Sequence, residues 1–152
     1  MKNILFVCTG NSCRSVMAEG LFKKYTESRK GEFMIGSAGI NALDGYPSTL
    51  ETIRVMQTED IDISGHRSRR LTYEMAAMAD HIYVMEEVHR EIILRMMPEA
   101  KHKLELLSDY SPEHKANAGH QDIPDPIRMS DSFYRNVLVV IRDCCRKLAE
   151  VL

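Results

Sequence analysis

The sequence predicts an α/β fold in which parallel strands are joined by helices, and three observations support this. Short apolar runs alternate along the chain with longer amphipathic stretches, a pattern typical of parallel strands connected by helices. The chain has 152 residues, which is the size of one domain with its own core. It contains no internal repeat, low-complexity tract or linker. We therefore expect a single domain over residues 1–152.

Four short apolar runs are the strand candidates. They are Asn3–Val7, Phe33–Ser37, His81–Met85 and Lys103–Leu107. Strands buried on both faces of a parallel sheet have such continuous apolar runs. We expect these four segments to form the sheet.

Five stretches with helical spacing are the helix candidates. They are Ser15–Tyr25, Pro47–Glu59, Thr72–Met78, Glu87–Met96 and Ser130–Leu152. Proline suits the first turn of a helix, so Pro47 favours a start there, while Pro98 ends the fourth candidate. In the last helix Cys144 and Cys145 fall among regularly spaced apolar residues, so we interpret both as core packing.

Charge and composition exclude several classes of protein. The net charge of -2 is not that of a nucleic-acid binder, and no apolar stretch approaches the roughly 18 residues of a membrane span. Met1-Lys2-Asn3 leads directly into a strand, which leaves no room for a signal peptide. All four cysteines can be explained without disulfides. We expect a cytoplasmic protein with no membrane or nucleic-acid partner.

The run Cys8-Thr9-Gly10-Asn11-Ser12-Cys13-Arg14-Ser15 follows the first strand and precedes the first helix. Ligands of open α/β sheets bind at the carboxyl ends of the strands, where this loop lies. The backbone amides of such a loop can surround a tetrahedral oxyanion, Arg14 can donate to two oxygens, and the helix N-terminus adds partial positive charge. The amides that would form this anion site are those of Thr9, Gly10, Asn11, Ser12, Cys13 and Arg14.

Within this loop Cys8 is the candidate nucleophile, because a positive field favours its thiolate form. Gly10 allows close approach of the backbone, and Asn11 tolerates a left-handed conformation. Ser15 can donate to the Cys8 sulfur or cap the first helix, and both roles can hold. The alternative, a buried cysteine that merely ends a strand, fits less well with the placement between strand and helix. The pattern predicts phosphoryl transfer to sulfur.

An acid that protonates the leaving oxygen must come from elsewhere in the chain. The candidate is Asp125, whose flanking prolines restrict the backbone and would fix the direction of its carboxylate. A loop Asp before Pro is often only a turn residue, and Asp122 is the nearest alternative. Both lie at the end of the long segment 109–126, and loops of that length usually carry function or form a lid.

Together these motifs resemble the low-molecular-weight protein tyrosine phosphatases. The resemblance spans nearly the whole chain, with the motifs in order. It rests on Cys8–Ser15, Met17–Glu19, Ser37-Ala38, Ser64–Arg69, Met85–Glu87, Leu104–Leu107, Asp125-Pro126 and Cys144–Arg146.

The resemblance implies a four-stranded parallel sheet with helices on both faces, and hydrolysis of phosphomonoesters through a phosphocysteine, without metal or cofactor. The substrate would be a phosphorylated protein, and we expect a monomer or weak dimer. By this resemblance Cys8 is the nucleophile, Arg14 binds the phosphate, and Asp125 is the general acid that later activates water. Ser15 would stabilise the thiolate.

The resemblance also implies roles for residues that the spacing alone would leave unassigned. Asn11, Ser37 and His66 match a hydrogen-bonded set that holds the phosphate-binding loop in shape. Cys13 matches a second loop cysteine that traps oxidised Cys8 as a reversible disulfide. Without the family, His66 would be an ordinary loop histidine and Arg67–Arg70 a solvated face.

Departures from the family pattern leave the substrate open. Animal members have two tyrosines after the acid, where this chain has Ile127 and Arg128, and Leu43 falls at another position that is aromatic there. Nearby Tyr46 is a possible substitute. Tyrosine phosphatases commonly have an aliphatic residue in place of Ser12, whereas bacterial arginine phosphatases have threonine. A protein arginine phosphatase is therefore the first alternative.

Two further alternatives belong to other functional classes. A thiol-dependent arsenate reductase has an identical loop, but it passes electrons through further cysteines after the third strand, where this chain has Met85–Arg90. A phosphate-binding module, or a zinc site built from Cys8 and Cys13, would require no catalysis. Zinc is disfavoured because no second pair of ligands is evident.

Overall fold

Four parallel strands form the sheet, as predicted. The computed structural model describes residues 1–112 and 122–152, and the strand order is β2-β1-β3-β4. The strands are β1 (Lys2–Cys8), β2 (Phe33–Gly39), β3 (His81–Val84) and β4 (Leu104–Leu106). The first strand is central, with β2 and β3 paired in parallel on either side. The loop that follows β1 therefore leaves the middle of the carboxyl edge.

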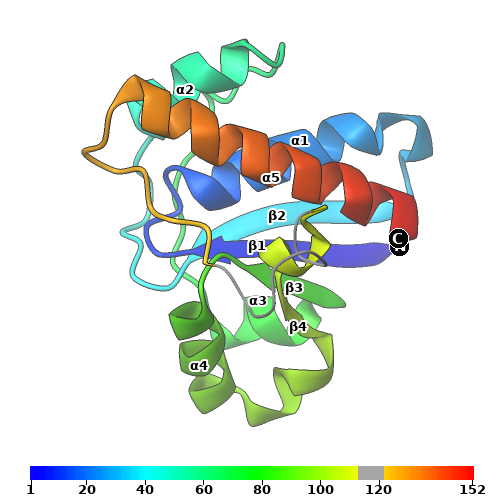
Figure 1. Ribbon diagram of the computed structural model, residues 1–152. Helices are drawn as coiled ribbons and strands as arrows, with labels where there is room; N and C mark the ends of the chain where they lie inside the picture. The colour runs from blue at the N-terminus through cyan, green and yellow to red at the C-terminus, as the bar shows by residue number, and fades with distance from the viewer. Residues whose placement is uncertain (113–121) are drawn as a thin grey trace.

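Helices cover both faces of the sheet (Figure 1). On one side lie α1 (Arg14–Tyr25) and α5 (Asp131–Val151), with α2 (Leu50–Gln57) beside the start of α5. On the other side lie α3 (Tyr73–Met78) and α4 (Glu87–Met96). Short 3-10 helices span Glu27–Arg29, Pro98–Lys103 and Leu107–Tyr110. None of the helices within 1–112 and 122–152 has the length and apolarity needed to cross a membrane.

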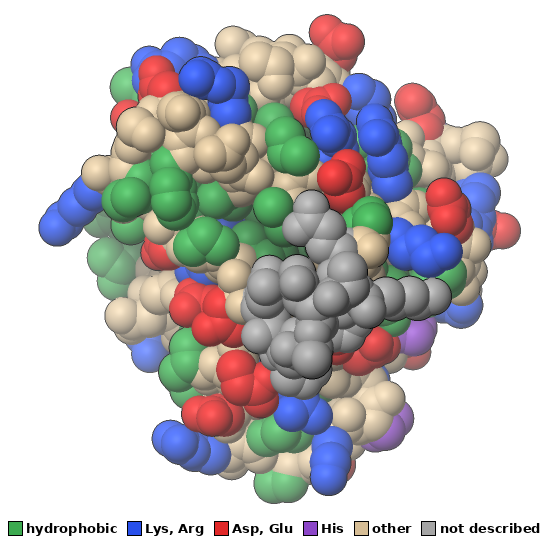
Figure 2. Space-filling view, in the orientation of Figure 1, with side chains coloured by type: hydrophobic (Ala, Val, Ile, Leu, Met, Phe, Trp, Pro, Cys, Tyr) green, Lys and Arg blue, Asp and Glu red, His purple; other side chains and the backbone are tan. Residues whose placement is uncertain are grey.

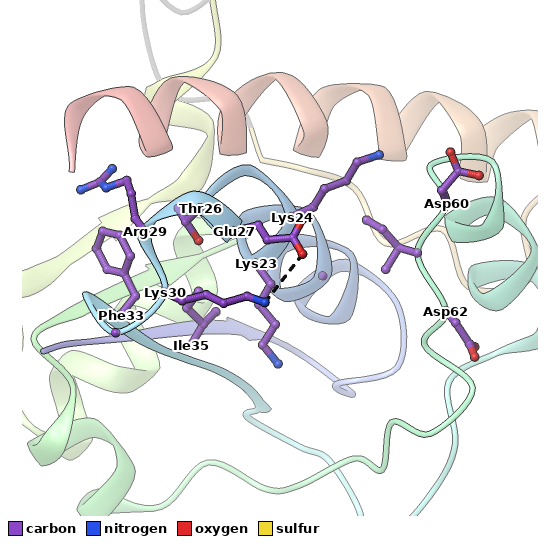
Figure 3. A pocket seen from close by; sticks show the side chains of 13 residues that line it. Lys23, Lys24, Thr26, Glu27, Arg29, Lys30, Phe33, Ile35, Asp60 and Asp62 are labelled. Carbon is purple, nitrogen blue, oxygen red and sulfur yellow. Dashed lines mark ion pairs between the residues drawn. The ribbon is translucent and has the colours of Figure 1, made fainter.

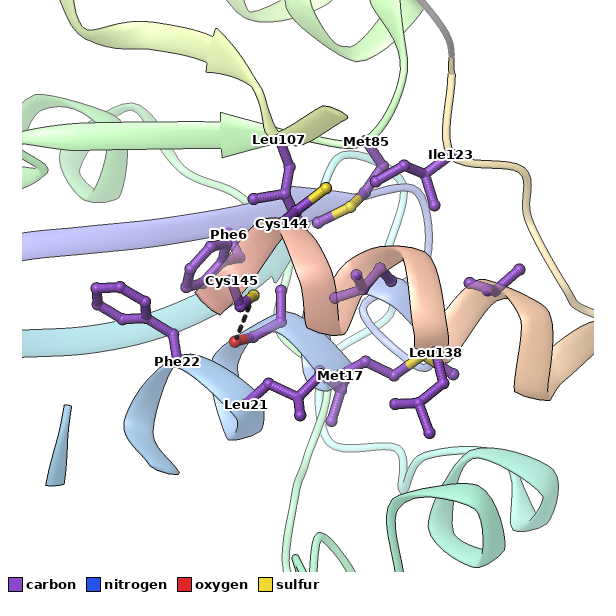
Figure 4. Close-up of a cluster of buried hydrophobic side chains, with 14 of the residues drawn as sticks. Phe6, Met17, Leu21, Phe22, Met85, Leu107, Ile123, Leu138, Cys144 and Cys145 are labelled. Atoms are coloured by element: carbon purple, nitrogen blue, oxygen red, sulfur yellow. Dashed lines mark hydrogen bonds between the residues drawn. The ribbon is translucent and has the colours of Figure 1, made fainter. Parts of the chain in front are cut away.

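The alternation of side chains along β1 explains why the core has two halves. Phe6 and Cys8 pack into the cluster beneath α1 and α5, which Figure 4 shows in close-up. Leu5 and Val7 point the other way and pack with buried residues of β3, α3 and α4. Because successive side chains of a strand alternate between faces, one continuous apolar run supplies both halves.

The predicted start of the second helix at Pro47 is wrong. The helix begins at Leu50, because Thr49 is the N-cap: its side chain accepts the backbone N–H of Thr52 at 3.2 Å. A side-chain oxygen in this position satisfies a backbone donor that the helix itself cannot, which fixes the first turn. Ser130 caps α5 in the same way and accepts from Phe133.

The segment 109–126 was predicted to be a long functional loop or lid. Its beginning continues a 3-10 helix that runs from Leu107 to Tyr110, and its end, from Asp122, lies beside α4. Residues 113–121 lie outside the described part of the chain, so the lid remains a prediction.

Candidate active site

The loop between β1 and α1 is anchored through its backbone to the end of β2. Ile40 donates to the Cys8 carbonyl and Asn41 to the Thr9 carbonyl, both at 2.9 Å. Gly39 is needed for this close approach, since a β-carbon there would lie 2.6 Å from the Thr9 oxygen. Asn11 has a φ of 53°, the left-handed conformation that the sequence predicted it could adopt.

The fully buried side chain of Asn11 holds the loop in this shape. Its amide nitrogen donates to Ser15 Oγ at 2.8 Å and to Ser37 Oγ at 2.9 Å. Its side-chain oxygen accepts the backbone N–H of Arg69 at 3.0 Å, and the backbone carbonyl oxygen of Asn11 lies 3.0 Å from His66 Nε2. The structure thus brings together the predicted set of Asn11, Ser37 and His66.

Ser15 contacts the sulfur of Cys8 and does not cap the helix. Cys13 is the N-cap residue of α1 and makes no side-chain capping bond, so the capping alternative for Ser15 is wrong. Ser15 lies inside the first turn, with its Oγ 2.9 Å from Cys8 Sγ. Because Asn11 donates to the same oxygen, the Ser15 proton is available to the sulfur.

Arg14 is 1% exposed and is fixed along one edge of its guanidinium. Its Nη1 donates to Glu86 Oε2 at 2.6 Å and to the Ile123 carbonyl at 2.7 Å, which uses both protons of that nitrogen. Its Nη2 lies 3.4 Å from Thr9 Oγ1. The Nε–Nη2 edge is therefore the one available to a bidentate anion.

The two candidate acids occupy different places. Asp125 lies beside the loop, with Oδ2 3.6 Å from Arg14 Nη2, and its side chain is 40% exposed. Asp122 accepts the backbone N–H of Glu87 at 2.9 Å, at the first residue of α4. Asp122 thus ties its segment to α4, and Asp125 is the carboxylate in contact with the arginine.

Several residues of the site were not assigned by the sequence. Glu86 and the Ile123 carbonyl fix Arg14, and Glu19 accepts from Ser37 Oγ at 2.5 Å. Glu86 is the second residue after β3, and its place near the carboxyl end of a strand is the signal that could have identified it.

Arg67, Arg69 and Arg70 are exposed, as the residues alone suggest, but Arg69 also contacts the loop and its neighbouring strand. Its backbone N–H binds Asn11, and its Nε donates to the Ser37 carbonyl at 2.8 Å. Ser68, the neighbour, is 4% exposed. This run therefore supports the loop from behind.

The rim of the site carries exposed apolar side chains on two loops. One of these loops, residues 40–49, reaches the phosphate-binding loop where the backbone N–H of Thr49 donates to the Ser12 carbonyl. Leu43 and Tyr46 of the same loop are exposed. The segment after Asp125 presents Ile127 and Met129. Figure 2 shows hydrophobic and acidic side chains together on the left of the molecule, the side on which the loop lies in Figure 1.

Cys13 lies among hydroxyl groups beneath the loop. Its sulfur is 3.6 Å from Thr49 Oγ1 and 3.7 Å from Tyr134 Oη, and both loop cysteines are free thiols. Burial raises the pKa of Tyr134 to about 12. In the part of the chain that the structure describes, no three His, Cys, Asp or Glu side chains are grouped so that they could hold a metal ion.

A cavity of about 610 Å³ lies away from this site, between the end of α1 and the start of β2 (Figure 3). Lysines line it over an apolar floor that includes Phe33. These cations have partners: Lys23 pairs with Glu19, and Lys30 with Glu27 at 3.8 Å. The cavity is thus not a concentrated positive site.

Comparison with known proteins places the geometry in a family. The model of the low molecular weight phosphotyrosine protein phosphatases matches residues 3–152. The protein-tyrosine-phosphatase Wzb of Escherichia coli K12 is 33% identical over 151 residues, which cover 99% of this chain and 95% of Wzb. The protein-arginine-phosphatase of Bacillus subtilis is 31% identical over 150 residues, with 99% and 96% covered.

A solved structure shows the same arrangement of the chain. It is a cysteine-to-serine variant of YwlE arginine phosphatase with a phosphorylated active-site serine. The TM-score is 0.89 at 31% identity, and the match covers 99% of this chain and 95% of the other.

Proposed function

The chain belongs to the low molecular weight phosphotyrosine protein phosphatase family, and we propose that it hydrolyses phosphotyrosine in proteins through a phosphocysteine at Cys8. The observation that carries this proposal is the position of Cys8 at one end of the loop and of buried Arg14 at the other. The Ser15 hydroxyl lies 2.9 Å from the Cys8 sulfur, and Asp125 lies beside Arg14.

In the first step the Cys8 thiolate attacks phosphorus and the bond from phosphorus to the ester oxygen breaks. The Asp125 carboxylic acid gives its proton to the departing oxygen, so that an alcohol or phenol leaves. The Nε–Nη2 edge of Arg14 and the amides of residues 9–14 bind the phosphoryl oxygens as their charge increases. The products of this step are phosphocysteine and the Asp125 carboxylate.

In the second step water attacks the same phosphorus, and Asp125 takes the proton that the water loses. The bond between sulfur and phosphorus breaks, and the electron pair returns to the Cys8 sulfur. A hydrogen bond from Ser15 stabilises that leaving thiolate, which is the reason for its position. Inorganic phosphate is released, and the enzyme regains its starting charge.

Rapid-quench trapping tests this proposal. Acid quench during turnover of an aryl phosphate, followed by mass spectrometry, should locate a phosphoryl group on Cys8. Cys8→Ser should lose turnover, whereas Cys145→Ala, which removes a thiol of α5 outside the loop, should still form the Cys8 adduct. Turnover without any adduct, or retained hydrolysis in Cys8→Ser, would disprove the mechanism.

Ser12 favours one second candidate, a protein arginine phosphatase. This half-buried residue places a small hydroxyl in the loop, where the resemblance described above places threonine in arginine phosphatases. The relative from Bacillus subtilis carries that activity in its name. Phosphoarginine has a nitrogen leaving group, which Asp125 can protonate in the same way.

Matched peptides separate the two substrates. We expect kcat/KM to be higher for the phosphotyrosine peptide than for the phosphoarginine peptide. A parallel assay with arsenate tests the reductase alternative, and we expect no reduction. The isosteric pair Ser12→Thr and Ser12→Val tests the residue itself. If Ser12 decides the substrate, the hydroxyl variant should raise the ratio of phosphoarginine to phosphotyrosine turnover relative to the apolar one.

The broader setting is also proposed. We take residues 1–152 as one catalytic domain, a monomer or weak dimer, which acts on phosphorylated proteins in the cytoplasm. Four free thiols suit a reducing compartment, and the match to the family from residue 3 to residue 152 supports one domain.

A further inference from the structure

The half-buried side chain of Thr9 is held from two directions. Its Oγ1 lies 2.9 Å from Nε2 of His89, which comes from α4, and it accepts from Arg14 Nη2 at 3.4 Å. These contacts join the loop to a helix on the opposite face of the sheet from α1. The backbone anchors of the loop do not require them.

His89 is fixed in a single tautomer by its other ring nitrogen. Nδ1 accepts the backbone N–H of Glu86 at 3.1 Å, so it carries no proton. The ring is 2% exposed, and burial lowers the pKa of His89 below 6.5, with the charge of Arg14 as the second cause. The neutral ring therefore carries its proton on Nε2 and donates it to Thr9 Oγ1.

This donation determines where the proton of Thr9 can point. A hydroxyl has one proton and two acceptor positions, and His89 and Arg14 fill both of the latter. Among residues 1–112 and 122–152 no acceptor for the Thr9 proton is found. The nitrogen of Arg14 that contacts Thr9 lies on the edge available to an anion, so the hydroxyl stands beside the phosphate site.

We propose that the Thr9 hydroxyl donates a hydrogen bond to a phosphoryl oxygen, and that His89 is the positioning residue that turns this hydroxyl toward it. The inference rests on the proposed function, since it names an additional donor at the same site. A donor to a charged oxygen in a partly dry site is stronger than one to a neutral oxygen. It would stabilise the phosphoryl group in addition to the backbone amides and Arg14.

Substitution of Thr9 tests the donor. Thr9→Val keeps the shape and removes the hydroxyl, and it should lower kcat/KM for an aryl phosphate by about tenfold to a hundredfold. It should also weaken the binding of inorganic phosphate, measured by calorimetry. Thr9→Ser keeps the hydroxyl and should retain most of both. Phosphate binding as tight in Thr9→Val as in the unaltered chain would overturn the proposal.

Two substitutions of His89 separate positioning from a structural role. Asparagine can replace the Nδ1 acceptor but not the Nε2 donor, whereas glutamine can supply the donor to Thr9. We expect His89→Gln to bind phosphate nearly as the unaltered chain does, and His89→Asn to resemble Thr9→Val. The double variant Thr9→Val/His89→Asn should be no weaker than Thr9→Val, because both remove one interaction. Exposed His102→Asn is the control.

The outcomes are distinguishable from those of the proposed function. Equal phosphate binding in His89→Asn and His89→Gln would overturn the positioning role, while the Thr9 variants, which leave α4 intact, still test the donor. Calorimetry with inorganic phosphate needs no turnover. A chain that binds phosphate through Thr9 but forms no adduct at Cys8 would contradict the mechanism and leave this inference standing.

Discussion

The chain contains two pairs of buried cysteines whose sulfur atoms have different surroundings. Cys8 and Cys13 belong to the loop and are 2% and 3% exposed, while Cys144 and Cys145 belong to α5 and are fully buried. Exposure therefore does not distinguish a candidate nucleophile from a packing residue. The groups that surround each sulfur do.

The sulfur of Cys8 lies beside a hydroxyl whose proton is available to it, and it precedes the N-terminus of α1. The sulfur of Cys145 lies 3.7 Å from the carbonyl oxygen of Ala18, which can only accept a proton (Figure 4). Burial raises the pKa of Cys144 to about 12 and that of Cys145 well above its usual value. Donors favour a thiolate, and acceptors in an apolar core favour a thiol.

Among the changes to the surroundings of Cys8, Arg14→Lys should reduce activity most. It removes a planar pair of donors from the loop and leaves a point charge. We expect kcat/KM for an aryl phosphate to fall by roughly 10³–10⁵-fold, the usual contribution of an arginine to phosphoryl transfer. Steady-state kinetics measure the loss, and exposed Arg95→Lys serves as the matched control. Activity retained within tenfold would show that bidentate binding is not needed.

Asp125→Ala should have the next largest effect, since it removes the acid while leaving the thiol side of the contrast intact. We expect turnover to fall by about 10²–10⁴-fold. The loss should be largest for alkyl phosphates and smallest for substrates with an acidic phenol, which leaves without protonation. An equal loss across such a series would argue against Asp125 as the acid.

The contrast also shows how far the sequence could lead. The four strands, the loop and the packing role of Cys144 and Cys145 were predicted, because each depends on a local pattern of apolar and polar residues. The start of α2 was predicted too early, at Pro47, because proline suits a first turn. Thr49, two residues later, is the residue that caps the helix. The fold class was confirmed by the sheet, whose order follows from the pairing of β1 on both sides.

What the sequence missed are pairs far apart in the chain. Glu86 contacts Arg14 and His89 contacts Thr9 across 72 and 80 residues. The position of Glu86 after a strand indicates a place near the site, but no local pattern shows which residue either side chain contacts. The hydrogen bond from Arg69 Nε to the Ser37 carbonyl was missed for the same reason. Such contacts arise where several carboxyl ends of strands meet, so they become visible only when the sheet is assembled.

Alkylation of thiols should sharpen the contrast directly. Burial raises the pKa of Cys144 to about 12 and encloses its side chain, so iodoacetamide should not label α5 in the folded protein at pH 8. Cys8 should be labelled, and inorganic phosphate should protect it. Peptide mapping measures both, with protein unfolded in guanidinium as the control. Labelling of Cys144 at the rate of Cys8 would contradict the assignment.

The smallest expected effect is a pH dependence of folding stability. It tests whether burial disfavours the charged form of His89 beside the loop, as it does for the cysteines of α5. Burial and the charge of Arg14 lower the pKa of His89, while Glu86, Asp122 and Asp125 raise it less. A histidine with a lowered pKa binds its proton more readily in the unfolded chain, so folding stability should decrease as pH falls below about 6.5. The slope from one group cannot exceed about 1.4 kcal/mol per pH unit.

Urea unfolding between about pH 5 and pH 7.5 measures this dependence. We expect His89→Asn, which keeps the acceptor for Glu86 but cannot be protonated, to lose less stability on acidification than the unaltered chain, while exposed His102→Asn behaves like the unaltered chain. Identical pH profiles for all three would mean that the ring of His89 is protonated at no cost. Burial would then disfavour a charged group in α5 but not beside the loop. Water would have to reach the groups around Cys8 although the cysteine itself is buried.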